Sequence, residues 1–584
     1  MRFFKTFLAA LLAFFVFTGL CFLLLLMIIG RAISREPVTI SPNGVLVLKT
    51  SQAFNEQKVV NPVASFMGDE SSEIPGLFQA IRLIQHATTD DNIKGIYLKV
   101  DGSGNGFAGT EELRNAILRF RKSGKFVYAY GEVMTQQGYY LASAADKVFL
   151  NPKGGIDFSG FSSQLTFLKG TLEKLEIQPE IFYCGKFKSA TEPLRESQMT
   201  EANRVQTHQF LGQLYGNYLH GIAQTRKLDT ATLHGYANEN LIRESSDALK
   251  YKLVDALKYD DEVVNELKNK TGIKSDEDLN LVSFLKYNSS VTLSNGTSDN
   301  KIAVIYAQGD IISGESEKQT TIASEDYIHS IRKAREDKKV KAILFRVNSG
   351  GGSALASEVI WRELSLAKKV KPVVVSMGDY AASGGYYISC MADSIFAQPN
   401  TLTGSIGVFG IMFNMENFFK NKLGVTFDGV KTAPYADLGT MSRPLNDVEK
   451  RFIQDGVDSI YASFKSRVVA GRKLDAAVVD SIAQGRVWSG TDALRLGLVD
   501  RIGGLNEALN CAARLAKVSD YRMVEYPEIN KDKLFRLLKN VGGEVQESMV
   551  KREMGVNYDL YQQLKAIQHI PGDIQAKLPF MYKF

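Results

Sequence analysis

One serine in the chain stands where it could act as a nucleophile. Ser383 lies in the segment AASGGYY (381–387), after an apolar run and at the start of a predicted helix. Backbone N–H groups in the first turn of a helix have no intrahelical acceptor, so they can stabilise negative charge that develops beside a serine hydroxyl. This pattern indicates acyl-transfer chemistry at Ser383. Taken alone, a Ser-Gly-Gly tripeptide is more typical of a helix cap and a turn.

A glycine-rich turn supplies a second element of such a site. The segment NSGGG (348–352) follows a predicted strand at 342–347. Glycines let backbone N–H groups approach a ligand closely and form a concave surface that binds anions. The turn therefore predicts a place for the oxyanion of an acyl-transfer reaction, although glycines of this kind also occur in turns without a catalytic role.

The nucleophile needs a base, and histidine is a weak candidate for it. The histidines lie outside both motifs, so a Ser/His/Asp triad has little support, while partners distant in the sequence stay open. A lysine kept neutral by burial is the alternative. Its pKa would have to fall from about 10.4 to about 7 or 8, a change that desolvation can supply. The six histidines are at positions 86, 208, 220, 234, 329 and 569.

The cysteines do not suggest a metal site, a cofactor or a disulfide framework. They lie at positions 21, 184, 390 and 511, with no C-x-x-C pair and no histidine at metal-ligand spacing. Such isolated cysteines are typical of small buried apolar residues. We therefore expect chemistry that needs neither a metal nor a cofactor.

The elements that position these motifs belong to a tandem duplication. Residues 91–152 match residues 338–399 without a gap at an offset of 247, and later segments extend the duplicated unit to about 220 residues. Each unit contains two β-branched runs, at 95–100 and 126–130 in the first and at 342–347 and 373–376 in the second, which alternate with amphipathic helices. This alternation predicts an α/β layered fold for each unit.

Chain length, net charge and the N-terminal segment bear on the number of domains, the partners and the membrane location. The chain has 584 residues with 45% hydrophobic residues, enough for more than one domain, and its net charge of +6 argues against nucleic acid as a partner. Residues 7–30 carry no charge, which predicts a membrane span of about 20 residues or more, with a long signal peptide or a buried helix as alternatives. Two basic residues flank the run on each side, so charge does not fix its orientation.

These observations divide the chain into five parts. We predict an N-terminal membrane anchor at 1–35, a first repeat at 36–273, a linker at 274–300, a second repeat at 301–526 and a C-terminal tail at 527–584.

Three segments resemble the signature sequences of the signal peptide peptidase A family, also called protease IV, in its long tandem-repeat form. They are GKFKSATEPL (185–194), MGDYAASGGYYIS (377–389) and TLTGSIGVFG (401–410). The resemblance implies two ClpP/crotonase-like repeats and a serine endopeptidase that degrades short apolar peptides such as cleaved signal peptides. It further implies a single-pass protein of the bacterial inner membrane, with its catalytic part on the periplasmic side, that assembles into a homo-oligomer, with a tetramer favoured.

The resemblance also assigns roles to residues of the site. The family usually has a proline where Gly350 stands, which affects the expected detail of the oxyanion turn. Lys186 is the competing candidate for the base. Glu192, close to both lysines, is expected to be a solvated charge, with a neighbour that opposes the fall in the lysine pKa as the alternative. The assigned residues are Ser383 as nucleophile, Lys188 as general base, Ser405 as the hydroxyl that orients the lysine, and the N–H groups of Gly384 and Gly351 as oxyanion donors.

The duplication indicates where the two catalytic residues meet. Ser383 aligns with Gln136, so the first repeat lacks the nucleophile, and the region that aligns with Lys188, at 433–437, contains no lysine. Each repeat therefore keeps what the other lacks. We expect the dyad to form within one chain, and a dyad between neighbouring chains stays open. Two other classes of function also stay open, namely an enzyme acting on acyl-CoA thioesters and an inactive membrane scaffold.

Overall fold

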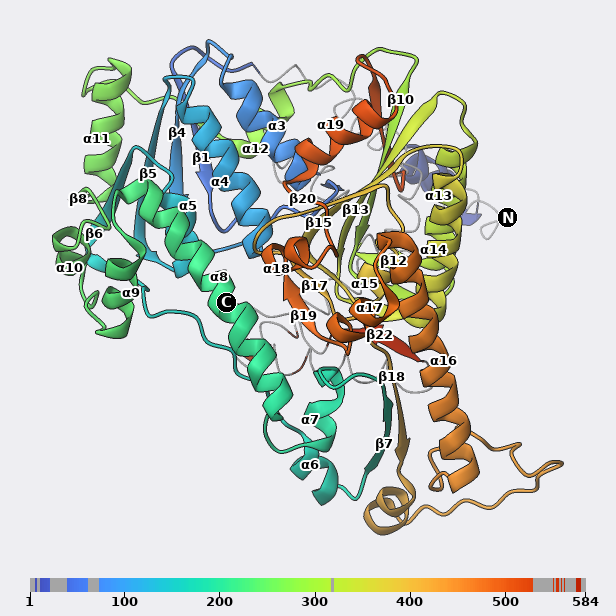
Figure 1. The fold of residues 1–584 in the computed structure, drawn as a ribbon. Helices are drawn as coiled ribbons and strands as arrows, with labels where there is room; N and C mark the ends of the chain where they lie inside the picture. Colours follow the sequence, from blue (N-terminus) through green and yellow to red (C-terminus); the bar gives the residue numbers. More distant parts are fainter. Residues whose placement is uncertain are drawn as a thin grey trace.

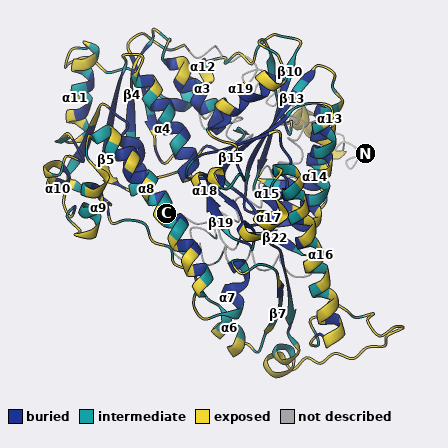
Figure 2. Ribbon diagram, viewed as in Figure 1, coloured by how far each residue is buried: buried dark blue, intermediate teal, exposed yellow. Residues whose placement is uncertain are grey.

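The computed structural model describes residues 6–7, 11–20, 39–60, 73–316, 320–528, 550, 553–555, 558, 561 and 574–578. Two α/β units lie next to each other, the first blue to green and the second yellow to red (Figure 1). Buried residues concentrate in the sheets of both units and on the helix faces turned toward them (Figure 2).

The first repeat is built on a six-stranded sheet in which all strands run parallel. Its strands are apolar on both faces, as parallel sheets covered by helices require. The strand order is β8 (Ala256–Leu257), β6 (Lys147–Ile156), β5 (Phe126–Met134), β4 (Ile93–Val100), β1 (Gly44–Lys49) and β9 (Leu281–Ser283). The helices are α3 (Leu77–Ala87), α4 (Phe107–Arg121), α5 (Gln136–Ala142), α6 (Lys169–Lys174), η2 (Ser189–Thr191), α7 (Glu192–Arg195), α8 (Glu201–Arg226), α9 (Thr230–Asn238), α10 (Ser245–Lys250), α11 (Asp260–Thr271) and α12 (Phe284–Ser290).

The second repeat has a corresponding sheet in which β19 alone runs antiparallel to its neighbour. The strand order is β19 (Val487–Ser489), β17 (Leu402–Gly404), β15 (Val373–Ala382), β13 (Val340–Ser349), β10 (Lys301–Gln308) and β21 (Arg522–Tyr526), with β16 (Ser394–Ala397) between β15 and β20 (Arg501–Ile502). The helices are α13 (Ser324–Glu336), α14 (Ala354–Lys368), α15 (Gly384–Tyr387), η3 (Phe418–Leu423), α16 (Asp447–Arg472), α17 (Ala476–Ile482), α18 (Gly490–Arg495) and α19 (Leu505–Leu515).

Corresponding elements of the two repeats begin at the offset that the sequence shows. β4 and β13 begin at Ile93 and Val340, and β5 and β15 begin at Phe126 and Val373, both pairs 247 residues apart. The prediction of two α/β repeats is confirmed. The more specific likeness to the ClpP/crotonase fold stays a prediction from the resemblance.

A third sheet joins distant parts of the chain. Strand β7 of the first repeat pairs antiparallel with β18 of the second over six residue pairs. Its order is β12 (Thr321–Ala323), β11 (Asp310–Ile312), β14 (Gly351–Ser353), β22 (Gln575–Lys577), β18 (Phe409–Asn414) and β7 (Gln178–Tyr183). A separate two-stranded ribbon consists of β2 (Val59–Val60) and β3 (Glu73–Ile74). The segment that follows β7 is thereby brought next to the segment that precedes β18.

Two predicted parts of the chain, the linker and the tail, contribute strands to the sheets. The predicted linker contains β9 and α12, and β9 pairs with β1 at the edge of the first sheet. The predicted tail contributes β22 to the third sheet. In the part of the chain that the structure describes, no helix combines the length and apolarity needed to cross a membrane. The predicted span at 7–30 lies mostly outside the described residues. Within the span, residues 11–20 are described, and they are helical.

A buried ion network links the two repeats. Arg346 on β13 is fully buried, and its Nε lies 2.8 Å from Glu56 Oε2 while its Nη2 lies 2.6 Å from Glu112 Oε1. Both carboxylates belong to the first repeat and are themselves buried. Burial raises the pKa of Glu112, and the charge of Arg346 opposes that rise. Removing one partner from such a network leaves a charge unpaired in an apolar interior, which is strongly destabilising.

A second contact attaches the strand that carries Ser383 to the first repeat. Asp379 lies on β15, four residues before Ser383, and its Oδ1 accepts hydrogen bonds from the N–H groups of Ala108 (2.8 Å) and Gly109 (3.1 Å). These groups open helix α4 of the first repeat, whose N-terminus favours a negative charge. A Cβ on Gly106 would lie 2.4 Å from Asp379 Oδ1, so only glycine allows this approach. The strand before Ser383 is therefore attached to the other repeat.

Candidate active site

Ser383 lies at a sharp junction between a strand and a helix. β15 ends at Ala382 and α15 begins at Gly384, and Ser383 between them has φ 55° and ψ −115°, a conformation that residues other than glycine rarely adopt. The Ser383 N–H donates to Gly404 O at 2.8 Å, and Ala382 pairs with Gly404 across β15 and β17. Strand pairing thus holds the strained backbone in place and fixes the direction of the hydroxyl.

Lys188 follows β7 and is held by a loop of the second repeat. The N–H of Phe187 donates to Gln484 O at 2.7 Å. Gly485 has φ 73°, and a Cβ there would lie 2.7 Å from the backbone nitrogen of Lys188. Gln206 on α8 donates to Phe187 O at 3.0 Å. The lysine segment of the first repeat is therefore fitted tightly against the second.

The structure brings the predicted base to the predicted nucleophile. Lys188 Nζ lies 2.8 Å from Ser383 Oγ, 3.2 Å from Ser405 Oγ and 3.4 Å from Ser405 O. Ser383 Oγ in turn donates to Gly407 O at 3.3 Å. Both side chains are shielded from solvent, with exposed fractions of 0% for Ser383 and 1% for Lys188. Ser405 lies where a hydroxyl that orients the lysine is expected.

Burial gives Lys188 the acid–base property that a general base needs. Desolvation lowers the pKa of Lys188 from 10.5 to about 7. The ring centroid of Phe409 lies 5.9 Å from Nζ, which adds to the apolar surroundings. A pKa near 7 leaves a substantial fraction of the amine neutral at physiological pH, and a neutral amine can accept the serine proton.

The prediction that Glu192 is a solvated charge is wrong. The side chain is buried, with an exposed fraction of 2%. Its carboxylate accepts hydrogen bonds from Thr200 Oγ1 (2.5 Å), Thr200 N (3.2 Å) and Asn203 Nδ2 (2.8 Å), at the start of α8. The helix N-terminus thus binds this carboxylate. Lys186, the competing base candidate, is exposed, and its Nζ lies over the ring of Phe187.

The glycine turn lies against the start of α15. Gly351 has φ 101°, and a Cβ on it would lie 2.7 Å from Gly384 N, so the two glycines are in close contact. The N–H of Gly351 donates to Ser349 Oγ at 3.1 Å in this structure. The N–H of Gly384 opens α15, directly after the nucleophile. Of the two predicted oxyanion donors, the geometry therefore favours Gly384, while Gly351 directs its N–H to a side chain.

The equivalent place in the first repeat is filled by glutamines. Gln137 Nε2 donates to Asn105 O at 2.6 Å and to Thr110 Oγ1 at 2.9 Å. Gln136, which aligns with the nucleophile, donates to Gly160 O at 2.8 Å and accepts from Gly160 N at 3.1 Å. The first repeat therefore contains Lys188 but has hydrogen-bonded glutamines at the positions that align with Ser383 and Gly384.

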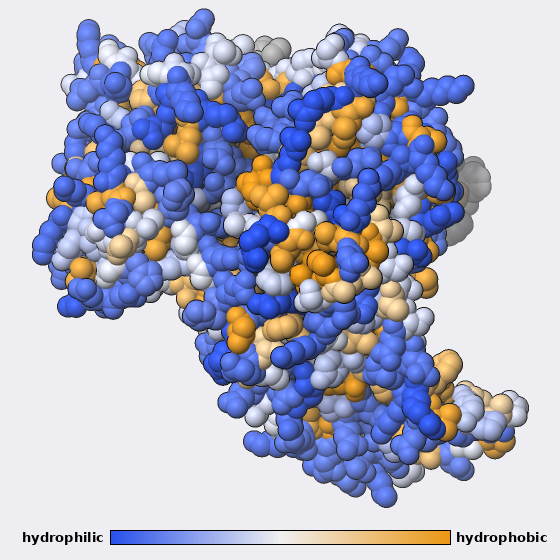
Figure 3. Space-filling view, viewed as in Figure 1, coloured by the Kyte–Doolittle hydropathy of each residue, from blue (hydrophilic) through white to orange (hydrophobic). Residues whose placement is uncertain are grey.

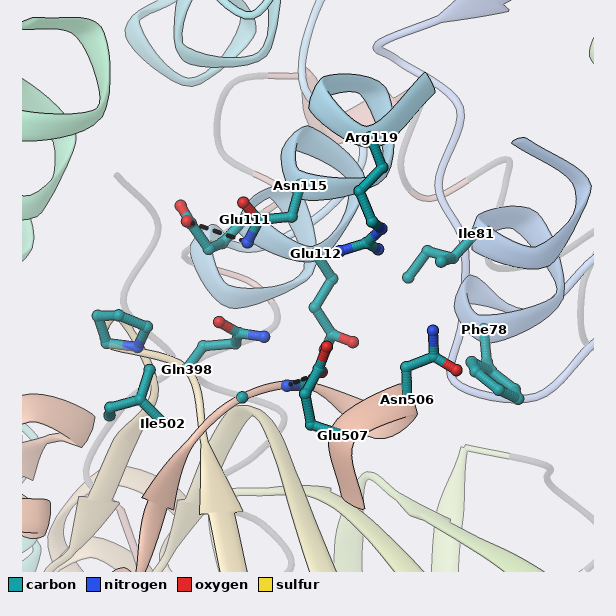
Figure 4. Close-up of a pocket in the computed structure, with 13 residues that line it drawn as sticks. Phe78, Ile81, Glu111, Glu112, Asn115, Arg119, Gln398, Ile502, Asn506 and Glu507 are labelled. Atoms are coloured by element: carbon teal, nitrogen blue, oxygen red, sulfur yellow. Dashed lines mark hydrogen bonds between the residues drawn. The ribbon is translucent and has the colours of Figure 1, made fainter. Parts of the chain in front are cut away.

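A cavity at the boundary between the repeats lies apart from the dyad (Figure 4). It has a volume of about 250 Å³ and lies beside the buried carboxylate of Glu112. Neither dyad residue lines it, and in the described part of the chain no cluster of three or more His, Cys, Asp or Glu could hold a metal ion. The residues lining it come from both repeats and include Phe78, Ile81, Asn115, Arg119, Gln398 and Glu507.

Comparison with known proteins gives the family of this chain. Residues 119–274 and 365–519 each match the model of Peptidase family S49. The chain belongs to peptidase family S49. The first matched segment contains Lys188, and the second contains Ser383 and Ser405.

Relatives within family S49 match most of the chain. Protease 4 of Salmonella typhi is 37% identical over 85% of this chain and 81% of its own length. Protease 4 of Haemophilus influenzae is 34% identical over 92% of this chain and 90% of its own length. The chloroplastic serine protease SPPA of Arabidopsis thaliana is 34% identical over 79% of this chain and 69% of its own length. The predicted family is confirmed, and the chain is a serine peptidase that hydrolyses peptide bonds.

Proposed function

We propose that this S49 peptidase is a membrane-anchored endopeptidase that uses a Ser/Lys dyad to degrade short apolar peptides such as cleaved signal peptides. The observation that carries the dyad is the 2.8 Å separation between Lys188 Nζ and Ser383 Oγ. It is supported by the pKa of Lys188, which burial lowers to about 7. No other lysine contact with Ser383 competes with it among the described residues.

The reaction follows from these contacts. Ser383 Oγ attacks the carbonyl carbon of the peptide bond while its proton passes to Lys188 Nζ. The carbonyl oxygen becomes negative beside the N–H of Gly384, which stabilises it. Nζ then gives the proton to the leaving amine, and the peptide bond breaks to leave an acyl-enzyme. A water attacks this ester with Lys188 again accepting the proton, which releases the acid and restores the serine hydroxyl.

The dyad is tested with single substitutions. Ser383→Ala and Lys188→Ala are each expected to lower kcat by about 10³-fold or more, because the two residues act as one unit. Lys186→Ala removes a neighbouring exposed lysine and is the matched control, expected to retain activity. A serine-directed fluorophosphonate should label the native chain and not Ser383→Ala, whereas an acyl-CoA enzyme or an inactive scaffold would not be labelled. Near-native activity in either dyad variant would refute the assignment.

We propose that the dyad is completed within one chain. The support is that β7 and β18 pair directly and bring the two repeats' residues together without a second copy. Mixing Ser383→Ala chains with Lys188→Ala chains, under conditions that exchange subunits, should yield an inactive mixture, since every chain lacks one partner. Recovered activity in the mixture would mean that the site forms between chains.

The substrate class follows from the apolar surroundings of the site. A charged substrate side chain in an apolar pocket would be desolvated without a partner, at a cost above the roughly 1 to 3 kcal/mol that apolar contacts discriminate. We therefore expect small or apolar residues before the scissile bond. A peptide-library screen checks this, and a strong preference for Lys or Arg would contradict it.

Membrane anchoring is proposed for residues 7–30. The support is an uncharged run that exceeds the about 20 residues needed to cross a bilayer. With the family resemblance, it supports a location in the bacterial inner membrane, in contact with the lipid bilayer and with the catalytic part on the periplasmic side. Extraction of membranes with alkaline carbonate should leave the chain in the pellet, and protease added to spheroplasts should digest it. Release of the intact chain into the carbonate supernatant would refute the anchor.

A homo-oligomer, with a tetramer favoured, is proposed from the resemblance and from an exposed segment. The segment between η3 and α16 projects from the body (Figure 1), and apolar side chains gather there at the lower right of the space-filling view (Figure 3). Such exposed apolar surface is typical of an interface. Native mass spectrometry tests the assembly, and a monomer would refute it. The exposed apolar residues are Leu423, Val425, Phe427, Val430, Tyr435, Leu438 and Met441.

A further inference from the structure

The C-terminal tail contributes a strand to the wall of the active site. β22 pairs antiparallel with β14, where Ala576 lies opposite Gly352. It also pairs antiparallel with β18, where Gln575 lies opposite Phe409. β14 begins at the glycine turn, and β18 follows the segment that carries Ser405. The tail therefore lies between the two strands that flank the dyad, whereas the other strands of the third sheet come from the two repeats.

The backbone of the tail lies directly against the glycine turn. The N–H of Leu578 donates to Gly350 O at 2.7 Å, which extends the pairing beyond β22. A Cβ on Gly351 would lie 2.0 Å from Ala576 O, and a Cβ on Gly384 would lie 3.0 Å from the same oxygen. A main-chain carbonyl of the tail thus lies next to Gly384, the proposed oxyanion donor, and next to Gly351 of the glycine turn.

Leu578 fills an apolar pocket beside the nucleophile. Its exposed fraction is 4%, and Ala576, on the same face of the strand, is fully buried. Lys577 between them turns to the opposite side, where its Nζ lies 2.7 Å from Asp310 Oδ2. The pocket adjoins Ser383 because one of its members directly precedes that residue. The members that pack with Leu578 are Phe210, Leu214, Ala382, Leu402 and Val487.

We propose that β22 occupies the cleft that receives peptide substrates, so that the C-terminal tail competes with substrate from within its own chain. This inference rests on the proposed function, because it assumes that the cleft serves Ser383. An extended peptide that lies between two strands gains main-chain hydrogen bonds, and its alternate side chains enter pockets. The tail binds in this way through Ala576 and Leu578. It thereby specifies the substrate class as extended peptides with small or apolar side chains at alternate positions.

A tethered competitor acts at a high effective concentration, because its binding is intramolecular. Substrate must therefore displace the tail before it can reach the dyad, and the complete burial of Ser383 agrees with an occupied cleft. Weakening the tail should raise the apparent affinity for substrate and leave the chemical step unchanged.

The test is peptide binding to a chain that cannot turn substrate over. In a Ser383→Ala background, a dye-labelled peptide with the sequence of residues 572–580 (GDIQAKLPF) is titrated with the full chain, and its Kd is read from fluorescence anisotropy. Leu578→Asp places a charge in the apolar pocket and should release the tail, which lowers the Kd of the labelled peptide about ten-fold. Deletion of residues 574–584 should have the same effect. Leu515→Asp makes the same substitution at a leucine that is 42% exposed on α19, and should leave the Kd unchanged.

Equal Kd values for the chain with its native tail and the chain with Leu578→Asp would overturn the inference, and so would an equal decrease in Leu515→Asp. With Ser383 present, Leu578→Asp should also raise kcat/KM for a short apolar peptide about ten-fold at unchanged kcat. The proposed function and the role of the tail can be refuted separately. Absence of Ser383-dependent hydrolysis would refute the proposed function, whereas a ten-fold lower Kd in the inactive background would still establish that the tail fills the cleft.

Discussion

Replacing Lys188 with methionine should stabilise the fold while it removes the base. The amine is buried, and burial lowers its pKa from 10.5 to about 7. At about 1.4 kcal/mol per pKa unit, the native fold disfavours protonation of this amine by about 5 kcal/mol. Methionine has a similar length and no charge, so it avoids this penalty. The variant loses the hydrogen bonds from Nζ to Ser383 and Ser405, and this loss reduces the gain in stability by about 1 to 2 kcal/mol.

The stability gap between the two chains should depend on pH. Between the folded pKa of Lys188, about 7, and its unfolded value of 10.5, the unfolded native-sequence chain binds one more proton than the folded chain. Its free energy of unfolding therefore rises with pH across this window. Lys188→Met lacks that rise. The free energy of unfolding of the variant should exceed that of the native chain by about 3 kcal/mol at pH 7. This difference should shrink toward pH 10.

Urea unfolding followed by circular dichroism at pH 7, 8, 9 and 10 measures this gap. Lys186→Met is the matched control, because its amine is exposed and no gap is expected at any of these pH values. A Lys188→Met chain that is less stable than the native one at pH 7 would refute the reasoning. A gap that stays constant with pH would refute it too. Peptidase activity, measured on the same samples, should be lost.

Four further outcomes are expected. The kcat/KM for peptide hydrolysis should rise with pH through about 7 as Lys188 loses its proton, and a fall across that range would count against the dyad. Activity should be indifferent to a chelator, and loss that zinc restores would contradict this. Gly485→Ala should lower kcat/KM about ten-fold or more, since the new Cβ would lie 2.7 Å from the backbone of Lys188. Unchanged kinetics would show that the loop can shift without displacing Lys188, which would contradict this prediction. Arg346→Met should lower the free energy of unfolding by about 3 to 5 kcal/mol because it leaves Glu56 and Glu112 buried without their partner, and an unchanged thermal midpoint would exclude that role.

The fold of the repeats could be predicted because its signals are local. The β-branched runs that begin β5 and β15, and the offset between them, are visible in the chain itself. Ser383 could be singled out in the same way, since the strand, the serine and the two glycines are contiguous. Lys188 lies 195 residues away, so residue patterns alone could not connect it to the serine or separate it from Lys186.

The rest depends on contacts that no local pattern records. The burial of Glu192 follows from Thr200 and Asn203 at the start of α8, eight and eleven residues later. Gly485 is required only because Lys188 passes within van der Waals distance of it. The third sheet is assembled from strands of three parts of the chain, namely the first repeat, the second repeat and the tail. Its strands β14 and β22 have three residues each, too few to show a period. Such strand pairing can be recognised only from the three-dimensional arrangement of the two repeats.

Each repeat depends on the other for a buried ion pair and for one residue of the proposed dyad. Separated from the first repeat, the second would keep Arg346 without the carboxylates of Glu56 and Glu112, and Ser383 without the amine of Lys188. A chain opened at residues 291–300 should therefore give two fragments that are inert apart and become a peptidase on meeting. If each fragment were fused to one of two proteins whose association can be induced, peptidase activity would report that association.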